Sequence, residues 1–202
     1  VMITCEKDGD LWIVTLDRTD KANALTADML TALCEVVEGA DSAKVIILTG
    51  AGKVFSAGAD LDEARAGLAT SPLWERLSGA ISAFKGLTIA ALNGTAAGGA
   101  MGMVLACDLR IAVAGAKFFY PVMRLGFLPQ PSDPKRMRAL IGPARTKLVL
   151  MGGAKILADE ALAWGLIDKI VDADQLMSLA RTLSNDALHA DPGHIAGIKA
   201  LV

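Results

Sequence analysis

Two glycine-bearing turns are the stretches of this sequence whose residue types and spacing are suited to chemistry. One is residues 55–61 (FSAGADL), after an apolar run at 45–48, and the other is residues 93–100 (NGTAAGGA), after an apolar run at 88–92. Each turn places small residues at the start of a predicted helix, where backbone N–H groups lack partners and carry partial positive charge. Small side chains let a ligand approach that backbone closely. Two such turns facing each other would aim two N–H groups at one oxygen, which is the geometry of an oxyanion hole.

Spacing alone leaves two interpretations of these turns open. They are either tight structural turns or a site for an anion or oxyanion, because small residues serve both purposes. Neither turn matches the phosphate-binding loop of nucleotide hydrolases or the glycine fingerprint of dinucleotide-binding domains. The sequence therefore indicates a backbone-lined site without naming its ligand.

Histidine and cysteine provide little for other kinds of catalysis. The two histidines, His189 and His194, lie near the end of the chain, and we expect both on the surface of helices. A Ser-His-Asp triad or a zinc site is therefore not expected, and no metal ligands are assigned. The three cysteines, Cys5, Cys34 and Cys107, have no metal-ligand spacing and are odd in number, which is typical of reduced thiols in a cytoplasmic protein.

The composition excludes several classes of protein. The 202 residues are 53% hydrophobic and 21% charged, with a formal net charge of −2. A chain of this length fits one domain that buries its own core without a disulfide or metal staple, and it is too apolar for disorder. A near-neutral charge with no basic cluster, together with 4% aromatic residues, argues against a nucleic-acid partner.

An uncharged run at residues 87–107 is long enough to cross a membrane and contains Gly94-x-x-x-Gly98, a packing motif of membrane helices. However, Asn93-Gly94 is a strong turn signal, and Gly98-Gly99 interrupts any helix. We therefore expect a strand, a turn and a short buried helix here, and no membrane association.

The elements that must position the two turns follow from hydrophobic periodicity. Strands alternate with helices, which indicates an α/β domain with largely buried strands. The final third is mostly helical. The predicted hairpin spans 2–7 and 11–16; further strands are predicted at 45–49, 88–92 and 109–114, and helices at 26–39 (with Thr26 as N-cap), 61–68, 72–85, 99–107, 134–141, 144–152, 157–164 and 174–188.

Several motifs along the chain resemble one known family. Residues 56–61 (SAGADL) resemble the first signature of the crotonase family, also called the enoyl-CoA hydratase/isomerase family. The second signature is similar to the pattern formed by Asn93-Gly94, Gly98-Gly99 and Cys107-Asp108. Further similar stretches, in unbroken order over nearly the whole chain, are 21–25 (KANAL), 47–50 (ILTG), 125–129 (LGFLP) and 160–168 (EALAWGLID).

The resemblance implies a fold, an assembly and a ligand. The fold would be a single crotonase-like domain over 1–202, with a spiral core of repeated ββα units at about 1–142 and a helical region at about 143–202. The assembly would be a homotrimer or a dimer of trimers. The ligand would be an acyl-CoA thioester, with no separate cofactor because coenzyme A is part of the substrate. Family members usually continue for a few tens of helical residues beyond the position of Val202, so we expect a C-terminal truncation.

The resemblance also implies roles for individual residues. Ala59 and Gly99 would donate the two backbone N–H groups to the thioester oxygen, lowering the cost of an enolate at the neighbouring carbon. Lys21 and Lys53 would line the coenzyme A nucleotide pocket, although both are equally explained as solvated surface lysines. The same pocket would include Ala22, Leu61 and Asp60, which alternatively caps a helix. The acyl group would meet Tyr120 and Val122 among candidates that are otherwise core residues: Phe84, Met101, Phe118 and Phe127.

The sequence departs from the family at the positions of its usual acids. Hydratases of the family place one glutamate three residues after the second oxyanion glycine, and this position is Gly102. The second glutamate follows a proline further along, where Val122 stands. Several isomerases carry an acid at the position of Gln130. None of these three side chains is a general base, so hydration by the two-glutamate route is not expected.

Other polar residues near the expected site have two interpretations each. Asp133 is either a catalytic acid or the N-cap of a helix with Pro134 at its first position. Tyr120, the only tyrosine, either packs in the core or donates a proton. Arg124 is suited to a salt bridge or to an anionic group of the ligand, and Asp62 and Glu63 are expected to face solvent.

Two functional hypotheses follow. In the first, the chain is an enzyme that uses the oxyanion hole on an unusual acyl-CoA, as an isomerase, decarboxylase or thioesterase. In the second, it is a non-catalytic acyl-CoA binder or assembly subunit, because Gly102, Val122 and Gln130 replace the usual acids.

Overall fold

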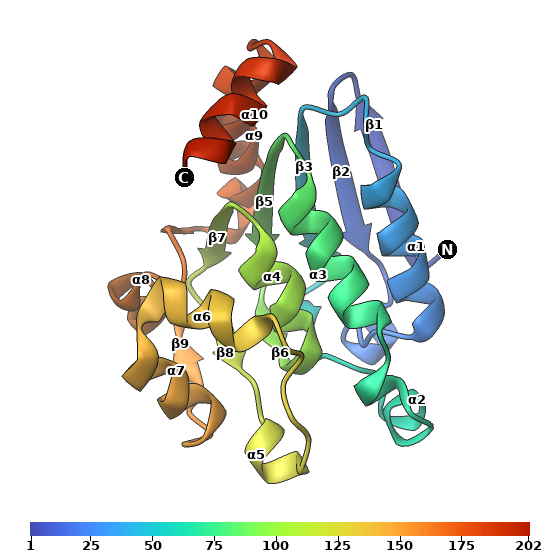
Figure 1. The fold of residues 1–202 in the computed structure, drawn as a ribbon, viewed down its shortest axis with the longest axis vertical. Coiled ribbons are helices and arrows are strands. Elements are labelled where there is room, and N and C mark those ends of the chain that lie inside the picture. The colour runs from blue at the N-terminus through green and yellow to red at the C-terminus, as the bar shows by residue number, and fades with distance from the viewer.

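Two β-sheets and the helices that join them make up the fold of the computed structural model, which describes residues 1–202 (Figure 1). The larger sheet has six strands in the order β1-β2-β3-β5-β7-β10, and only the β1–β2 pair is antiparallel. The smaller sheet has four strands in the order β4-β6-β8-β9. The larger sheet comprises β1 (Ile3–Asp8), β2 (Leu11–Leu16), β3 (Val45–Gly50), β5 (Leu87–Leu92), β7 (Leu109–Val113) and β10 (Lys169–Val171); the smaller comprises β4 (Val54–Ser56), β6 (Thr95–Ala97), β8 (Lys117–Phe119) and β9 (Ile156–Leu157).

A ββα unit repeats through the first two thirds of the chain. In the three units that start at β3, β5 and β7, the first strand joins the larger sheet, the second joins the smaller sheet, and a helix follows, whereas β1 and β2 both join the larger sheet. The parallel pairs β4–β6 and β6–β8 therefore stack the second strands of successive units side by side. This arrangement is the α/β spiral of repeated ββα units that the resemblance to the crotonase family implies. The helices of the repeats are α2 (Leu61–Arg65) with α3 (Leu73–Ala83), then α4 (Met101–Ala106), then α5 (Val122–Leu125).

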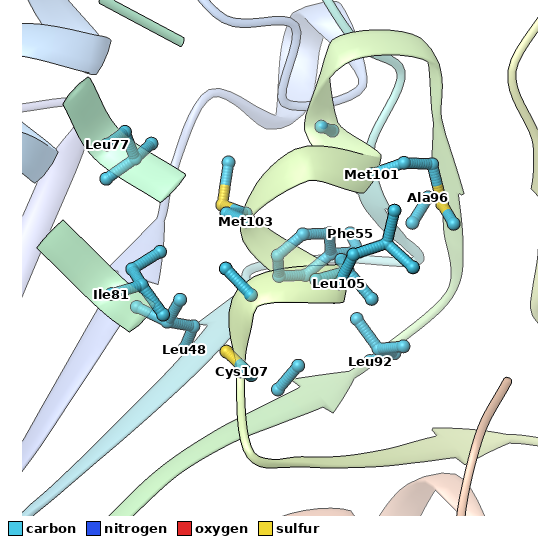
Figure 2. Close-up of a cluster of buried hydrophobic side chains, with 14 of the residues drawn as sticks. Leu48, Phe55, Leu77, Ile81, Leu92, Ala96, Met101, Met103, Leu105 and Cys107 are labelled. Atoms are coloured by element: carbon cyan, nitrogen blue, oxygen red, sulfur yellow. The ribbon is translucent and has the colours of Figure 1, made fainter. Parts of the chain in front are cut away.

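The larger sheet is buried on both faces, which explains why its strands are nearly continuous apolar runs. One face packs against α1 (Ala27–Glu38), α3 and α4, and the other against α9 (Leu176–Leu188). Figure 2 shows side chains from both sheets meeting those of α3 and α4 in the core. The labelled side chains include Leu48, Phe55, Ile81, Leu92 and Met103.

The C-terminal third adds helices around this core. Helices α6 (Asp133–Ile141), α7 (Pro143–Leu150) and α8 (Ala158–Trp164) lie on one side, and α9 and α10 (Pro192–Leu201) end the chain (Figure 1). Lys199 of α10 donates to the Gly86 carbonyl and pairs with Asp108, at 2.9 Å in each case, which attaches the last helix to the sheet.

A buried arginine connects two of the family-like motifs. The guanidinium of Arg110 donates to the carbonyls of Cys107 at 2.6 Å and Leu166 at 2.9 Å, and its side chain has no carboxylate partner. Its backbone N–H donates to Asp168 at 2.8 Å. These contacts join β7 to the end of α4 and to the turn after α8, so both motifs serve the fold.

The predicted helices and strands are confirmed, whereas five short strands, the short helix α5 and the ten-residue helix α10 are missing from the prediction. Helix α1 begins after Thr26, whose hydroxyl accepts from the Met29 N–H at 3.1 Å, as expected of an N-cap. Helix α2 ends at Arg65 rather than at residue 68, because the chain turns left-handed at Gly67. Strands β4, β6, β8, β9 and β10 and helices α5 and α10 were not predicted.

The uncharged run at 87–107 forms β5, β6 and α4, as the turn signals indicate. None of the helices combines the length and the apolar character that crossing a membrane would require. The two histidines are exposed at the end of α9 and on α10, and all three cysteines are free thiols.

Candidate active site

The two glycine-bearing turns lie against each other. Gly58 has φ +98° and Gly98 has φ +59°, values that favour glycine. A Cβ on Gly58 would lie 2.9 Å from the Ala97 carbonyl oxygen and 3.5 Å from the Gly98 Cα. Any larger residue at position 58 would push the turns apart, so the sequence has glycine where the two backbones meet.

Backbone pairing leaves the N–H of Ala59 free. The segment around Leu25 runs parallel to the first turn: the Leu25 N–H donates to the Gly58 carbonyl at 2.7 Å, and the Asp60 N–H donates to the Leu25 carbonyl at 2.8 Å. In a parallel bridge the residue between these two bonds points its own N–H to the opposite side. The Ala59 N–H has no acceptor among the turn and loop hydrogen bonds.

The second turn presents Gly99 at the start of a helix. Residues Gly98–Ala100 form a 3₁₀ turn that continues into α4, and the first N–H groups of such a turn have no acceptor within it. A Cβ on Gly99 would lie 2.9–3.1 Å from the Trp74 ring. The indole N–H of Trp74 donates to the Leu68 carbonyl at 2.7 Å, so the ring is held against the turn.

Both turns open onto one apolar cavity of about 160 Å³. Thirteen of its 18 lining residues are hydrophobic, and none has a carboxyl, amine, guanidinium or imidazole group. Three of the six candidates for an acyl pocket line this cavity: Tyr120, Val122 and Phe127. The other three belong to or pack against the core: Met101 and Phe118 are fully buried, and Phe84 is half-buried.

The predicted nucleotide-pocket residues lie around the two turns but only Leu61 lines the cavity, with 71% of its surface exposed. Lys21 and Lys53 are exposed and form no ion pair within the chain. Ala22 adopts φ +50°, and its carbonyl accepts from the Ala57 N–H at 3.0 Å, so this segment adjoins the first turn.

Asp60 is occupied by structural contacts. Its carboxylate accepts from the Glu63 N–H at 3.1 Å and so caps α2, and it pairs with Arg18 at 2.8 Å. The hydrogen bond from the Glu63 backbone, followed by the contact with Arg18, lowers the pKa of Asp60. The capping interpretation of Asp60 is therefore confirmed.

Two asparagines that the sequence analysis did not single out hold the loops beneath the site. The side-chain amide groups of Asn23 and Asn93 both donate to the Val54 carbonyl, at 2.8 and 3.0 Å. The amide oxygen of Asn23 accepts from the Arg18 N–H, and that of Asn93 accepts from the Gly50 N–H. Asn93 was recognised as part of a turn signal and of the second signature, and Asn23 as part of the stretch at 21–25, but nothing in the sequence marked Asn23 as buried.

The prediction that Asp133 is an N-cap is wrong. Helix α6 begins at Asp133 itself, and Ser132 precedes it at the cap position without a side-chain capping bond. The N–H and hydroxyl of Ser132 donate instead to Glu75, at 3.1 and 2.8 Å. The Asp133 side chain is instead buried and accepts a 2.7 Å hydrogen bond from the Tyr120 hydroxyl.

Glu63 does not face solvent either. Its carboxylate accepts from the Ala27 N–H at 2.8 Å, at the start of α1, whereas Asp62 is exposed as expected. The free N–H groups at the start of a helix explain this contact, because they attract a nearby carboxylate. Arg124 is exposed on α5 and pairs with no carboxylate of the chain.

Gly102 and Asp133 are in close contact behind the cavity. A Cβ on Gly102 would lie 3.0 and 3.1 Å from the two carboxylate oxygens of Asp133. Burial raises the pKa of Asp133 to about 6; the negative charge of Glu75 adds to this, whereas the Tyr120 hydrogen bond and Arg136 oppose it. Burial, followed by the charge of Asp133, raises the pKa of Tyr120 well above its usual range.

Gln130, at one of the positions where the family resemblance implies an acid, is tied to the cavity wall. Its side-chain amide donates to the Ala69 carbonyl at 2.9 Å, and its backbone N–H donates to the Tyr120 hydroxyl at 3.2 Å. No group of three or more His, Cys, Asp or Glu side chains is arranged to hold a metal ion.

Comparison with known sequences gives a consistent result. Residues 6–202 match the sequence profile of a family described as enoyl-CoA hydratase/isomerase. The chain is 33% identical over 199 residues to a short-chain-enoyl-CoA hydratase of Clostridium acetobutylicum, covering 94% of this chain and 76% of the relative. It is 35% identical over 208 residues to a carnitinyl-CoA dehydratase of Salmonella enteritidis, covering 96% and 77%.

Solved structures agree with the sequence comparison. Pseudomonas aeruginosa DspI superimposes with a TM-score of 0.91 and 32% identity, over 99% of this chain and 85% of that one. An enoyl-CoA hydratase from Bacillus anthracis also gives a TM-score of 0.91, with 29% identity, over 99% and 81%. These likenesses extend over almost the whole chain, including both turns.

Proposed function

Because the chain belongs to the enoyl-CoA hydratase/isomerase family, we propose that it binds an acyl-CoA thioester and polarises the thioester carbonyl with the N–H groups of Ala59 and Gly99. The observation that carries this proposal is the contact between the two turns at Gly58 and Gly98, above one apolar cavity. Both donors belong to rigid backbone beside that cavity. An apolar lining strengthens hydrogen bonds to a charged oxygen, because little water competes for them.

The chemical consequence is stabilisation of an enolate. When charge develops on the thioester oxygen, fixed N–H donors stabilise it without having to reorganise. Removing one such donor costs about 3–4 kcal/mol of barrier in enzymes where this has been measured. The carbon next to the thioester then becomes the reacting atom, for proton removal, proton addition or loss of a carboxyl group.

We also propose that Lys21 and Lys53 meet the phosphates of coenzyme A. Lys21 directly precedes the segment that pairs with the first turn, and both lysines are exposed without an ion-pair partner. Exposed lysines are available to a phosphate at little desolvation cost. Because their attraction acts through solvent, acyl-CoA affinity is expected to fall as salt concentration rises.

A second function, binding without turnover, is favoured by one specific observation. None of the residues that line the cavity has a carboxyl, amine, guanidinium or imidazole group, and Gly102, Val122 and Gln130 stand at the positions where the family resemblance implies acids. Under this alternative the cavity holds an acyl-CoA, and no proton is transferred.

The test is to measure binding first and chemistry second. Isothermal titration calorimetry with butyryl-CoA and free coenzyme A measures affinity, and absence of binding at millimolar ligand contradicts both functions. A panel of acyl-CoAs is then assayed for turnover. Binding without turnover above the uncatalysed rate selects the non-catalytic alternative.

The role of the Ala59 N–H is tested by replacing Ala59 with lactic acid, which exchanges the amide N–H for an ester oxygen and keeps the methyl group. Turnover is expected to fall by about 100-fold or more. The matched control is the same exchange at Ala43, whose N–H donates to the Ala40 carbonyl away from the cavity. Unchanged turnover in the Ala59 variant contradicts the proposed mechanism.

We further propose that the chain assembles as a homotrimer or a dimer of trimers. Large apolar side chains on α5, on the segment after it and on or next to α7 are exposed, and burial in a subunit contact would remove them from water. Sedimentation equilibrium measures the assembly, and a monomer at all concentrations would contradict it. The side chains are Met123, Leu125, Leu128, Leu148 and Met151.

A further inference from the structure

We propose that Tyr120 transfers the proton at this cavity and that Asp133, seated against Gly102, positions Tyr120 and exchanges protons with it. The inference rests on the proposed function, because it needs an acyl-CoA in the cavity. Tyr120 is the only residue with an acidic or basic side chain among those that line the cavity, so it is the group placed to transfer a proton there.

Tyr120 connects the cavity with the buried carboxylate. It follows β8, lines the cavity and donates to Asp133 Oδ2 at 2.7 Å. The backbone N–H of Gln130 donates to the same hydroxyl at 3.2 Å, which fixes the phenol oxygen from a second side. The ring is therefore held in place at the cavity wall rather than packed loosely.

Asp133 is an unusual side chain for a structural role. It is 1% exposed, does not cap its own helix, and one of its oxygens, Oδ1, has no hydrogen-bond partner. A buried carboxylate oxygen without a partner is costly and requires an explanation beyond the fold. Exchange of a proton with Tyr120 supplies one, because such a group must be able to change its charge.

Gly102 provides the space for this carboxylate. The three atoms nearest to the position of a Cβ on Gly102 all belong to the Asp133 carboxyl group, with its oxygens at 3.0 and 3.1 Å and its carbon at 3.4 Å. Glycine in the middle of a helix costs about 0.5–1 kcal/mol relative to alanine. Accommodation of Asp133 explains why the glycine is nevertheless there.

The proposed transfer moves two protons and one electron pair. As the C–H bond next to the thioester breaks, its electron pair moves onto the carbonyl oxygen, forming the enolate held by Ala59 and Gly99. The proton bonds to the Tyr120 oxygen while the original Tyr120 proton moves to Asp133 Oδ2. The reverse transfer protonates an enolate and leaves Asp133 ionised, so the pair serves as base or acid.

The groups that face Asp133 set the pH at which it acts. Tyr120 donates to it, Glu75 on α3 lies near enough to raise its pKa, and Arg136 on its own helix lowers it. With these effects and burial combined, the pKa of Asp133 is about 6. Proton removal needs the ionised carboxylate, so its rate is expected to rise through pH 6 and level off above pH 7.

The experiment measures exchange of the hydrogens next to the thioester of butyryl-CoA with D₂O, by mass spectrometry, for the wild-type protein. The variants Tyr120→Phe and Asp133→Asn are expected to lower the exchange rate by about 100-fold or more while still binding butyryl-CoA. The matched control is Glu38→Gln, which removes an exposed carboxylate that pairs with Arg76 on the surface and is expected to leave exchange unchanged.

A second measurement separates proton exchange from a purely structural contact. Tyr120 is the only tyrosine, so labelling tyrosine with ¹³C at Cζ gives a single NMR signal from this residue. Its chemical shift is expected to change with a midpoint near pH 6 in the wild type, matching the midpoint of the exchange rate, and to show no such change in Asp133→Asn. A structural contact alone would not make the two midpoints coincide.

The outcomes distinguish this inference from the proposed function. Exchange by the wild type that persists in Tyr120→Phe or Asp133→Asn overturns the inference and leaves the oxyanion proposal standing. Binding of butyryl-CoA by the wild type without any exchange also overturns it. Absence of binding overturns the proposed function and this inference together.

Discussion

The carboxylate of Asp133 fills the space beside the Cα of Gly102. A Cβ at position 102 would lie 3.0 Å from Oδ1 and 3.1 Å from Oδ2, closer than such atoms normally approach. The two residues come from α4 and α6, 31 positions apart, and each restricts the type of the other. This relationship can be measured directly as a coupling free energy.

The effect of Gly102→Ala on the free energy of unfolding is expected to change sign when Asp133 is replaced by alanine. In the wild type the new methyl group meets the buried carboxylate, so the free energy of unfolding should fall by about 1–2 kcal/mol. In the Asp133→Ala background that carboxylate is absent, and Gly102→Ala should raise the free energy of unfolding by about 0.5–1 kcal/mol, the usual gain within a helix. Urea unfolding of the four proteins measures both values.

Gly79→Ala is the control for that cycle. Gly79 lies within α3, and a Cβ there would meet nothing within 4 Å. The increase in the free energy of unfolding caused by Gly79→Ala is therefore expected to be the same whether position 133 is Asp or Ala. Additive effects of Gly102→Ala and Asp133→Ala would show that the two residues do not restrict each other.

The raised pKa of Asp133 predicts how stability depends on pH. Its pKa is about 6 in the folded chain against 3.8 in the unfolded chain, so the folded chain binds the proton more tightly between these values. Stability from this group is therefore greatest below pH 4 and is lost as pH rises through 6. A pKa shift of about two units corresponds to about 3 kcal/mol in the free energy of unfolding.

The measurement compares wild type with Asp133→Asn by urea unfolding at pH 4 and pH 7. The stability of the wild type relative to the variant is expected to decline by about 2–3 kcal/mol between the two pH values, because asparagine does not titrate. A relative stability that is flat, or that rises with pH, would show that the carboxyl group is not held in an environment that favours its neutral form.

The sequence predicted the parts of the fold that repeat a pattern over many residues. Helix α1 with its cap at Thr26 and the buried strands β3 and β5 were readable because apolar spacing and capping are local properties. Strands β4, β6 and β8 have three residues each, too few for any periodicity, so only the resemblance to a family implied the second sheet.

Some parts of the candidate site could likewise be predicted from local sequence, and others could not. Its two turns were visible because glycine clusters mark them, and the structure places Gly58 against Gly98. Asp133 before a proline looks locally like a helix cap, and only packing brings Tyr120, 13 residues earlier, to its carboxylate. A contact of this kind leaves no local signal, so no reading of the segment alone would have corrected the prediction.

Replacing the buried Arg110 is expected to destabilise the fold without touching the cavity. Arg110→Met keeps much of the side-chain volume but leaves the carbonyls of Cys107 and Leu166 without their charged donor. The expected loss is about 3 kcal/mol in the free energy of unfolding, since each buried acceptor left unpaired costs about 1–3 kcal/mol. Thermal or urea unfolding measures it, and a loss below about 1 kcal/mol would show that water replaces the guanidinium.

Gly99→Ala is expected to disturb the cavity although it keeps the backbone N–H. The new methyl group would lie 2.9–3.1 Å from three atoms of the Trp74 ring, and that ring cannot simply move away because its indole N–H donates to Leu68 at 2.7 Å. Relief of this contact requires a shift of the ring or of the turn, which should cost about 1–3 kcal/mol of stability. It should also weaken butyryl-CoA binding, because Trp74 forms part of the cavity wall.

Two measurements together identify the cause of the lower stability expected of Gly99→Ala. Replacing Trp74 with leucine in the Gly99→Ala protein removes the ring that the methyl group meets, so Gly99→Ala should cost less stability in that background than in the wild type. Tryptophan fluorescence of the single variant should also change, since the environment of the buried Trp74 ring is altered. An equal cost of Gly99→Ala in both backgrounds would mean that glycine at position 99 is required by the backbone of the turn rather than by its contact with Trp74.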